Sequence, residues 1–157
     1  MKAERIELKC IEDIESLMTW RAEVIEHVFG CRPDDKLLDA NRQYYLHHIE
    51  DGTHIAYVAS QEGRECGCGC ICLTEELPSP DNPSGRCAYL MNIYVREEYC
   101  NHGIAHKIVA RLIKEAKDRE CNKIYLETTD DGRPVYATLG FPDMPDMMKY
   151  YDTENKY

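Results

Sequence analysis

The chain has 157 residues, 43% of them hydrophobic and 31% charged, and this composition predicts one globular domain over residues 1–157. Its formal net charge of -10 disfavours binding to the phosphate backbone of nucleic acids. No apolar run approaches the ~18 residues of a membrane span, and the first ten residues alternate charged and apolar side chains where a signal peptide would need an apolar block. We therefore expect a cytoplasmic protein that binds neither nucleic acid nor membrane.

Hydrophobic spacing predicts the order of helices and strands. The predicted elements are helices over residues 11–29 and 34–49, hairpin strands over 54–60 and 66–74, a proline-rich surface loop over 76–86, a strand over 87–95, a helix over 103–119, a strand over 123–129, a short helix over 133–141 and a last strand over 147–151. Two helices thus precede an antiparallel stretch, after which strands and helices alternate. This order predicts an α/β fold, with a mixed, mostly antiparallel central sheet flanked by helices.

The chain contains nine cysteines, an odd number that favours free thiols over a disulfide framework when no secretory signal is present. The densest group, Cys66, Cys68, Cys70 and Cys72, alternates along a predicted strand. Neighbours on one face of a strand stand roughly 7 Å apart, whereas thiolates on one tetrahedral zinc bind at about 2.3 Å. We interpret these residues as small buried apolar side chains and expect no metal site; adventitious metal binding and redox chemistry are the alternatives.

The stretch from Tyr99 to Lys107 places Gly103 between a predicted strand and the most regular helical pattern in the chain. The first N–H groups of a helix have no intrahelical acceptor, and the helix dipole favours negative charge there. Gly103 would let an anion approach the main chain, and Ala105 keeps a following position small. The pattern predicts a phosphate-binding turn, with a tight strand-to-helix connection as the alternative.

Two familiar phosphate-binding motifs fit these residues poorly. The dinucleotide fingerprint requires three glycines and an acid at the end of the next strand; Glu127 matches the acid, but only Gly103 is present among the glycines. A P-loop requires Gly-Lys followed by Ser or Thr, and the sequence contains no such triplet.

A third pattern fits better. The hexapeptide Cys100-Asn101-His102-Gly103-Ile104-Ala105 lies between the predicted strand and helix, and Tyr136 lies four residues before the pair Gly140-Phe141. Both features resemble the GNAT superfamily of CoA-dependent N-acetyltransferases, whose signature is R/Q-x-x-G-x-G/A. The resemblance implies a GNAT-like fold with an acetyl-CoA-binding half over about residues 86–157 and an acceptor-side half over about residues 1–85. Cys100 stands at the first signature position, where the family usually has Arg or Gln, and we expect this difference to affect the affinity for acetyl-CoA.

The resemblance also implies roles for individual residues. The expected acetyl-CoA-binding residues are Ile93, Tyr94, Val95, Cys100, Asn101, His102, Gly103, Ile104, Ala105, His106 and Thr129. Tyr136 is the expected proton donor to the sulfur of departing CoA, and Glu127 the expected base that deprotonates the acceptor amine. Glu98 and His102 are alternatives as the base, and a covalent route through Cys100 is the alternative to direct transfer.

The resemblance therefore implies an enzyme that transfers the acetyl group of acetyl-CoA, a cosubstrate, to a primary amine. Residues 1–65 are net acidic and carry several aromatic and histidine side chains, so we expect a small cationic acceptor such as an aminoglycoside, a polyamine or an amino-acid derivative. A protein amine is one alternative. A module that binds acetyl-CoA or CoA as a sensor is another. The resemblance also implies a homodimer, an assembly that is common in the family.

Overall fold

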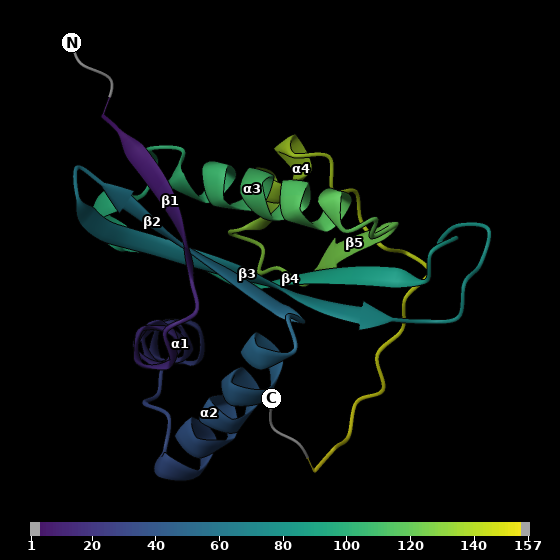
Figure 1. Ribbon diagram of the computed structural model, residues 1–157, viewed down its shortest axis with the longest axis horizontal. Helices are drawn as coiled ribbons and strands as arrows, with labels where there is room; N and C mark the ends of the chain where they lie inside the picture. The colour runs from purple at the N-terminus through teal and green to yellow at the C-terminus, as the bar shows by residue number, and fades with distance from the viewer. Residues whose placement is uncertain (1–3, 155–157) are drawn as a thin grey trace.

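The computed structural model describes residues 4–154 and shows one central sheet with helices on both faces (Figure 1). In chain order the elements are β1 (Ile6–Ile11), α1 (Ile14–Phe29), α2 (Asp35–Glu50), β2 (His54–Gln61), β3 (Arg64–Glu75), β4 (Arg86–Val95), the 3-10 turn η1 (Glu97–Tyr99), α3 (Ile104–Asp118), β5 (Lys123–Leu126) and α4 (Arg133–Thr138). The five strands are ordered β1-β2-β3-β4-β5. All neighbours are antiparallel except β4 and β5, which are parallel. The predicted mixed, mostly antiparallel α/β sheet is confirmed.

Helices α1 and α2 cover one face of the sheet, and α3 and α4 cover the other (Figure 1). The fully buried side of α3, which includes Ile104, Ile108 and Leu112, packs on the sheet. Each such aliphatic side chain contributes about 1.5–3 kcal/mol when it is removed from water. None of the helices within residues 4–154 combines the length and the apolar content that a bilayer span requires.

Two predictions at the ends of the chain were wrong. Residues Ile6–Ile11 form the edge strand β1, and α1 begins only at Ile14 because the side chain of Asp13 caps it, accepting a 2.9 Å hydrogen bond from the N–H of Ser16. At the other end, residues 147–151 form no strand. Met148 is 96% exposed there, so the apolar pattern of this segment has no surface against which to pack.

The alternating glycines and cysteines of β3 are explained by the helices on both sides of this strand. Gly69 faces α3, where a Cβ would lie 2.6 Å from Cγ2 of Ile108. Cys68 and Cys70 are buried on the opposite face, under α1 and α2. Cys66 instead packs on the α3 side, because a bulge in the pairing with β2 shifts the register. These cysteines therefore are buried small side chains, as predicted, but they do not all share one face.

Candidate active site

The strand β4 has a free edge at its C-terminal end. Its residues Cys87–Leu90 pair with Lys123–Leu126 of β5, yet β4 continues to Val95. In the described part of the chain no strand follows residues 91–95 on the β5 side, so backbone N–H and C=O groups on this edge can bond a ligand. We call residues 91–95 the free edge of β4.

A bulge interrupts the alternation of β4 within the free edge. Asn92 has a φ of 57°, and the pairing with β3 shifts its register at this point. As a result Met91 and Asn92 both point to the face covered by α1 and α2, where Met91 packs in the core and Asn92 meets Arg21. The bulge therefore places a polar side chain on the α1 side of a largely apolar strand.

The predicted phosphate turn immediately precedes α3. Gly103 is the N-cap of this helix with φ 74° and ψ 13°, and no side chain caps the helix. A Cβ on Gly103 would meet no atom within 4 Å, so glycine is favoured here by its left-handed backbone rather than by crowding. The first N–H groups of α3 are thus left without intrahelical or side-chain acceptors and face outward at a positive helix end.

The predicted cofactor-binding residues differ in whether their side chain or only their main chain is accessible to a ligand. Cys100, Asn101, His102, Gly103 and His106 are exposed around the start of α3. The side chain of Ile104 is buried and that of Ala105 is partly so, which leaves their N–H groups as the outward-facing parts. Side chains of Ile93 and Val95 pack toward α3, and Tyr94 lies beside Trp20 and His27. Of residues 93–95, the main chain on the free edge is therefore the part that can form hydrogen bonds with a cofactor.

Two of the candidate groups lie apart from the free edge or are already engaged. Thr129 lies between β5 and α4, and its carbonyl accepts hydrogen bonds from the N–H groups of Gly132 and Arg133. The ring of His102 lies 3.5 Å from Gln61 Oε1 and 3.7 Å from a carboxylate oxygen of Glu4. It is thus directed toward the ends of β1 and β2. His102 is poorly placed to deprotonate an amine.

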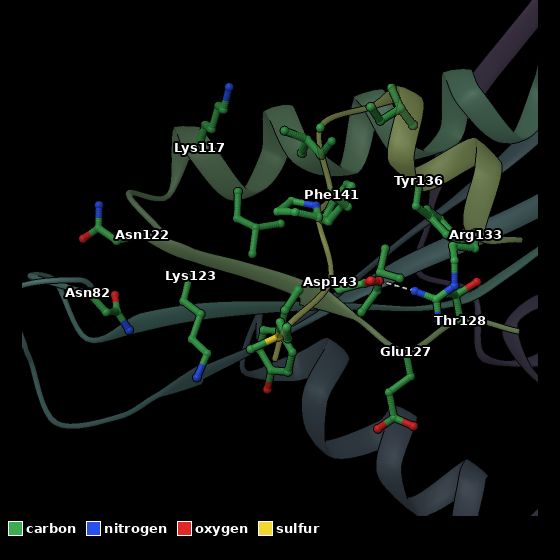
Figure 2. A pocket seen from close by; sticks show the side chains of 18 of the residues that line it. Asn82, Lys117, Asn122, Lys123, Glu127, Thr128, Arg133, Tyr136, Phe141 and Asp143 are labelled. Carbon is green, nitrogen blue, oxygen red and sulfur yellow. Dashed lines mark hydrogen bonds and ion pairs between the residues drawn. The ribbon is translucent and has the colours of Figure 1, made fainter. Parts of the chain in front are cut away.

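Tyr136 lines a groove of about 1020 Å³ beside β5 and α4 (Figure 2). Its ring packs edge-on against Phe141 with centroids 6.2 Å apart, and its carbonyl accepts from the N–H of Phe141 at 3.1 Å. These contacts explain the spacing of the Tyr-x-x-x-Gly-Phe motif. Burial raises the pKa of Tyr136 above its ordinary value of 10.0, so the hydroxyl stays protonated at neutral pH and has a proton to donate.

Glu127 lies at the end of β5 and points away from Tyr136 (Figure 2). Successive side chains of an extended segment face opposite sides, and Thr128 lies against Gly132 on the α4 side. Burial together with the charge of Glu127 raises the pKa of Tyr89 to about 12. The two residues predicted to handle protons therefore both line the groove beside β5, but their side chains point in different directions.

A second cavity, of about 500 Å³, lies on the α1 and α2 face beside the free edge of β4. Arg21 borders it, with Nε donating to Asn41 Oδ1 at 3.0 Å and Nη1 donating to Asn92 Oδ1 at 2.8 Å. The lining contains no Asp or Glu, and no carboxylate of residues 4–154 forms an ion pair with Arg21. We call this space the Arg21 cavity. Sequence reasoning expected aromatic and histidine side chains of residues 1–65 on the acceptor side, and Tyr44, Tyr45 and His48 line this cavity. It did not identify Arg21 or the contribution of β3 and β4.

The chain matches the family model described as "Acetyltransferase (GNAT) family" over residues 14–141. It belongs to the GNAT family. Thialysine N-epsilon-acetyltransferase from Sus scrofa is 32% identical over 95 residues, which cover 46% of this chain and 56% of that protein. The Bos taurus protein of the same name is 35% identical over 63 residues, or 38% of this chain and 37% of that one. The chain thus spans little more than half of one curated relative and less of the other.

Solved structures show the same GNAT fold. A Clostridium acetobutylicum protein described as a predicted acetyltransferase, solved with acetyl-CoA, has a TM-score of 0.82 at 24% identity, with 98% of this chain and 100% of that chain covered. An aminoglycoside N-acetyltransferase in complex with CoA has a TM-score of 0.73 at 13% identity, with 97% of each chain covered. At these identities the likeness extends to the fold alone.

Proposed function

We propose that this GNAT protein transfers the acetyl group of acetyl-CoA to the primary amine of a small molecule that also carries a carboxylate. The observation that carries the proposal is the free edge of β4, which lies between the uncapped start of α3 and the Arg21 cavity. A linear cofactor can bind along such an edge, and an acceptor in the adjacent Arg21 cavity can reach the end of that cofactor. The chain would act as a single domain, with residues from about 86 onward binding the cofactor and earlier residues forming most of the acceptor side.

The residues present fit the two chemically different parts of acetyl-CoA. The N–H groups at the start of α3 suit the pyrophosphate, because they combine unsatisfied donors with the positive end of the helix dipole. The backbone of residues 93–95 suits the amides of the pantetheine arm, in the manner of an added strand. Cys100 brings no charge to this site, so binding would depend mainly on the main chain.

Two side chains are proposed to move protons. Bound acetyl-CoA supplies the thioester, and the uncharged amine attacks its carbonyl carbon as the C–S bond breaks. Glu127 takes the proton from the acceptor ammonium, directly or through water, on the face covered by α1 and α2. Tyr136 donates its proton to the departing sulfur, and the tyrosinate so formed takes the second proton of the amine nitrogen as the amide forms. The different orientations of the two side chains suit this division, because the first proton leaves the amine before attack and the other transfer takes place at the sulfur.

The Arg21 cavity favours an acceptor with a carboxylate over a polyamine. A guanidinium held by two amide oxygens is fixed in orientation but keeps its full charge, and a carboxylate is its strongest partner. The lack of acidic lining residues leaves a second ammonium without a counter-charge there. The curated relatives are named for thialysine, an amino-acid acceptor, which supports an amino-acid derivative among the small cationic amines considered above.

A matched acceptor pair tests the proposal. With acetyl-CoA as donor, we expect lysine or thialysine to be acetylated with a kcat/KM at least ~10-fold above that of cadaverine, which has the same terminal amine without the carboxylate. Equal kcat/KM values for the amino acid and for cadaverine would contradict recognition of the carboxylate. Acetylation of peptides alone would indicate a protein N-acetyltransferase. If acetyl-CoA raises the melting temperature and no amine is acetylated, the protein is a cofactor-binding sensor and the proposed function is wrong.

A further inference from the structure

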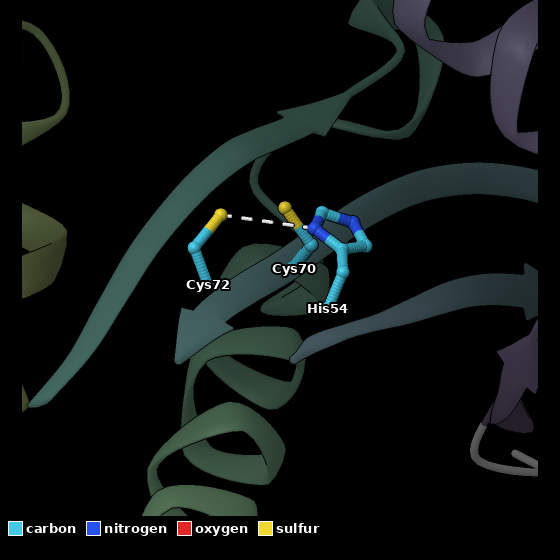
Figure 3. A group of neighbouring side chains, drawn as sticks. All are labelled: His54, Cys70 and Cys72. Atoms are coloured by element: carbon cyan, nitrogen blue, oxygen red, sulfur yellow. Dashed lines mark hydrogen bonds between the residues drawn. The ribbon is translucent and has the colours of Figure 1, made fainter. Parts of the chain in front are cut away.

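Three metal-ligating side chains gather at the floor of the Arg21 cavity: His54, Cys70 and Cys72 (Figure 3). His54 begins β2 and pairs directly with Cys72 of β3, while Cys70 lies two residues earlier on the same face. A ring nitrogen of His54 and the two Sγ atoms all lie within 4.8 Å of one another. The expectation that alternating cysteines keep their sulfurs too far apart for one metal was therefore wrong for this pair, because Cα spacing does not fix where the sulfurs point.

The separations are close to those of a tetrahedral zinc site. With Zn–S near 2.3 Å and Zn–N near 2.05 Å, ligand atoms on one zinc lie roughly 3.6 Å apart for S and N and roughly 3.8 Å apart for two sulfurs. Cys72 Sγ lies 3.7 Å from His54 Nδ1. The remaining separations, at most 4.8 Å, close by about 1 Å of side-chain movement. We propose that Cys70, Cys72 and His54 bind Zn²⁺, with the fourth position open to the Arg21 cavity.

The surroundings of the cluster suit metal binding. His54 is 5% exposed, and its Nε2 atom has no hydrogen-bond partner among the described residues, so Nδ1 is the ring atom that meets polar neighbours. The hydroxyl of Tyr44 lies 2.9 Å from this Nδ1 and 3.0 Å from Cys72 Sγ. It could remain beside the ion as a hydrogen-bonding neighbour of the ligands. The cavity gives the ion a route to the cluster.

Metal binding at these residues needs no oxidant. The thiolate is the form of cysteine that binds metals. Binding forms two Zn–S bonds and one Zn–N bond, releases to solvent the protons still carried by the sulfurs, and oxidises nothing. A set of two cysteines and one histidine with an open fourth position is one of the known catalytic zinc donor sets.

A second group of possible metal-ligating residues must be distinguished from His54, Cys70 and Cys72. His47, His48 and Asp51 also have ligand atoms within 4.8 Å of one another, but they lie at the exposed end of α2 and offer no sulfur. Binding there would be adventitious. The two groups are distinguishable because only the first changes the reactivity and the spectrum of thiolates.

Alkylation of the unmodified protein tests the site without any substitution. Metal-free protein is treated with N-ethylmaleimide with and without one equivalent of Zn²⁺, and the labelled cysteines are mapped by mass spectrometry. We expect zinc to slow alkylation of Cys72 at least ~10-fold, as ligation removes the free thiolate, while the exposed Cys31 and Cys100 react at unchanged rates. An unchanged rate at Cys72 would overturn the assignment.

Cobalt serves as a spectroscopic probe of the same ligands. Co²⁺ should give ultraviolet thiolate charge-transfer bands. Cys72→Ser should reduce these bands, because only the thiolate of Cys70 remains, and should weaken binding at least ~10-fold, since even the loss of a residue that supports a ligand lowers metal affinity 10–100-fold. The matched control is Cys68→Ser, a buried cysteine of the same strand and face outside the cluster. His47→Gln should leave the bands intact. Loss of binding in His47→Gln with retention in Cys72→Ser would show an adventitious ion only. Neither readout requires acetyl transfer, so failure of the proposed function would leave this test intact.

Discussion

The Nη1 of Arg21 donates a 2.8 Å hydrogen bond to the amide oxygen of Asn92, and this contact ties α1 to the bulge of β4. The partner residues are 71 positions apart in the chain. Because Asn92 belongs to the free edge of β4, the contact places a fixed positive charge beside the proposed reaction centre. In the proposed complex, recognition of the acceptor by Arg21 would therefore be coupled to the shape of the strand.

Arg21→Gln should raise the KM for a carboxylate-bearing acceptor by roughly 10- to 100-fold, since hydrogen bonds to charged groups contribute about 1.5–3 kcal/mol. The KM for cadaverine and the Kd for acetyl-CoA should change little. Steady-state kinetics with both acceptors measure this. The matched control is Arg42→Gln on α2, whose guanidinium pairs with Glu15 outside the cavity. An equal rise for both acceptors would indicate a general disturbance of α1 and contradict carboxylate recognition.

Tyr136→Phe should lower kcat by about 100-fold, because the departing thiolate then has no proton donor. Acetyl-CoA binding, measured by calorimetry, should be nearly unchanged, since the ring and its packing on Phe141 remain. Tyr125→Phe is the control, as it removes a hydroxyl from another tyrosine lining the same groove. Full turnover in the Tyr136 variant would exclude the proposed role.

Cys100→Arg should tighten acetyl-CoA binding by about fivefold, the equivalent of about 1 kcal/mol for an exposed charge beside the pyrophosphate. The site can accept the larger side chain because Cys100 is exposed. Calorimetric titration gives the dissociation constants, with Cys31→Arg as a control for the added charge on an equally exposed cysteine at a distance. Unchanged or weaker binding in Cys100→Arg alone would count against a phosphate site at this turn.

Stability should depend on pH through Glu23. Its carboxylate accepts hydrogen bonds from Arg96 at 3.0 and 2.9 Å, which hold its pKa below the ordinary 4.5. A lowered folded-state pKa stabilises the protein above the unfolded value, and this contribution is lost as the pH falls through the folded value. Glu23→Gln should therefore lower the unfolding free energy by about 1 kcal/mol at pH 7 for this partly exposed pair.

Urea unfolding of both proteins at pH 7 and at pH 3 measures this contribution. The difference between wild type and Glu23→Gln should shrink at the lower pH, where the wild-type carboxyl is increasingly protonated. A difference that stays constant between the two pH values would show that the loss is one of packing rather than of charge.

The fold was largely predictable because its main signals are local. The apolar stripe of α3, the glycine before it and the spacing from Tyr136 to Phe141 each lie within a short stretch of sequence. The edge strand β1 was missed although apolar and charged side chains alternate along residues 6–10, because this short strand pairs only with the distant β2. The opposite error at residues 147–151 arose because β-like composition does not supply a neighbouring strand.

The candidate site was predictable only where it follows one segment of chain. The turn before α3 is such a segment, and its backbone conformation follows from Gly103. The Arg21 cavity and the cluster of His54, Cys70 and Cys72 are not, because they combine side chains from α1, α2, β2, β3 and β4. Periodicity predicts on which face of a strand a side chain lies, but it does not predict the rotamers that bring two sulfurs and an imidazole together.

The close approach of Ile108 to Gly69 has a further consequence for the proposed complex. A methyl group on Gly69 would overlap Cγ2 of Ile108, which it would approach to 2.6 Å, and would push α3 outward from the sheet. The start of α3 would anchor one end of acetyl-CoA, whereas β4 would carry the other. By allowing α3 to pack closely on the sheet, Gly69 would set the distance between the phosphates and the reacting sulfur of the proposed complex, although it would contact neither.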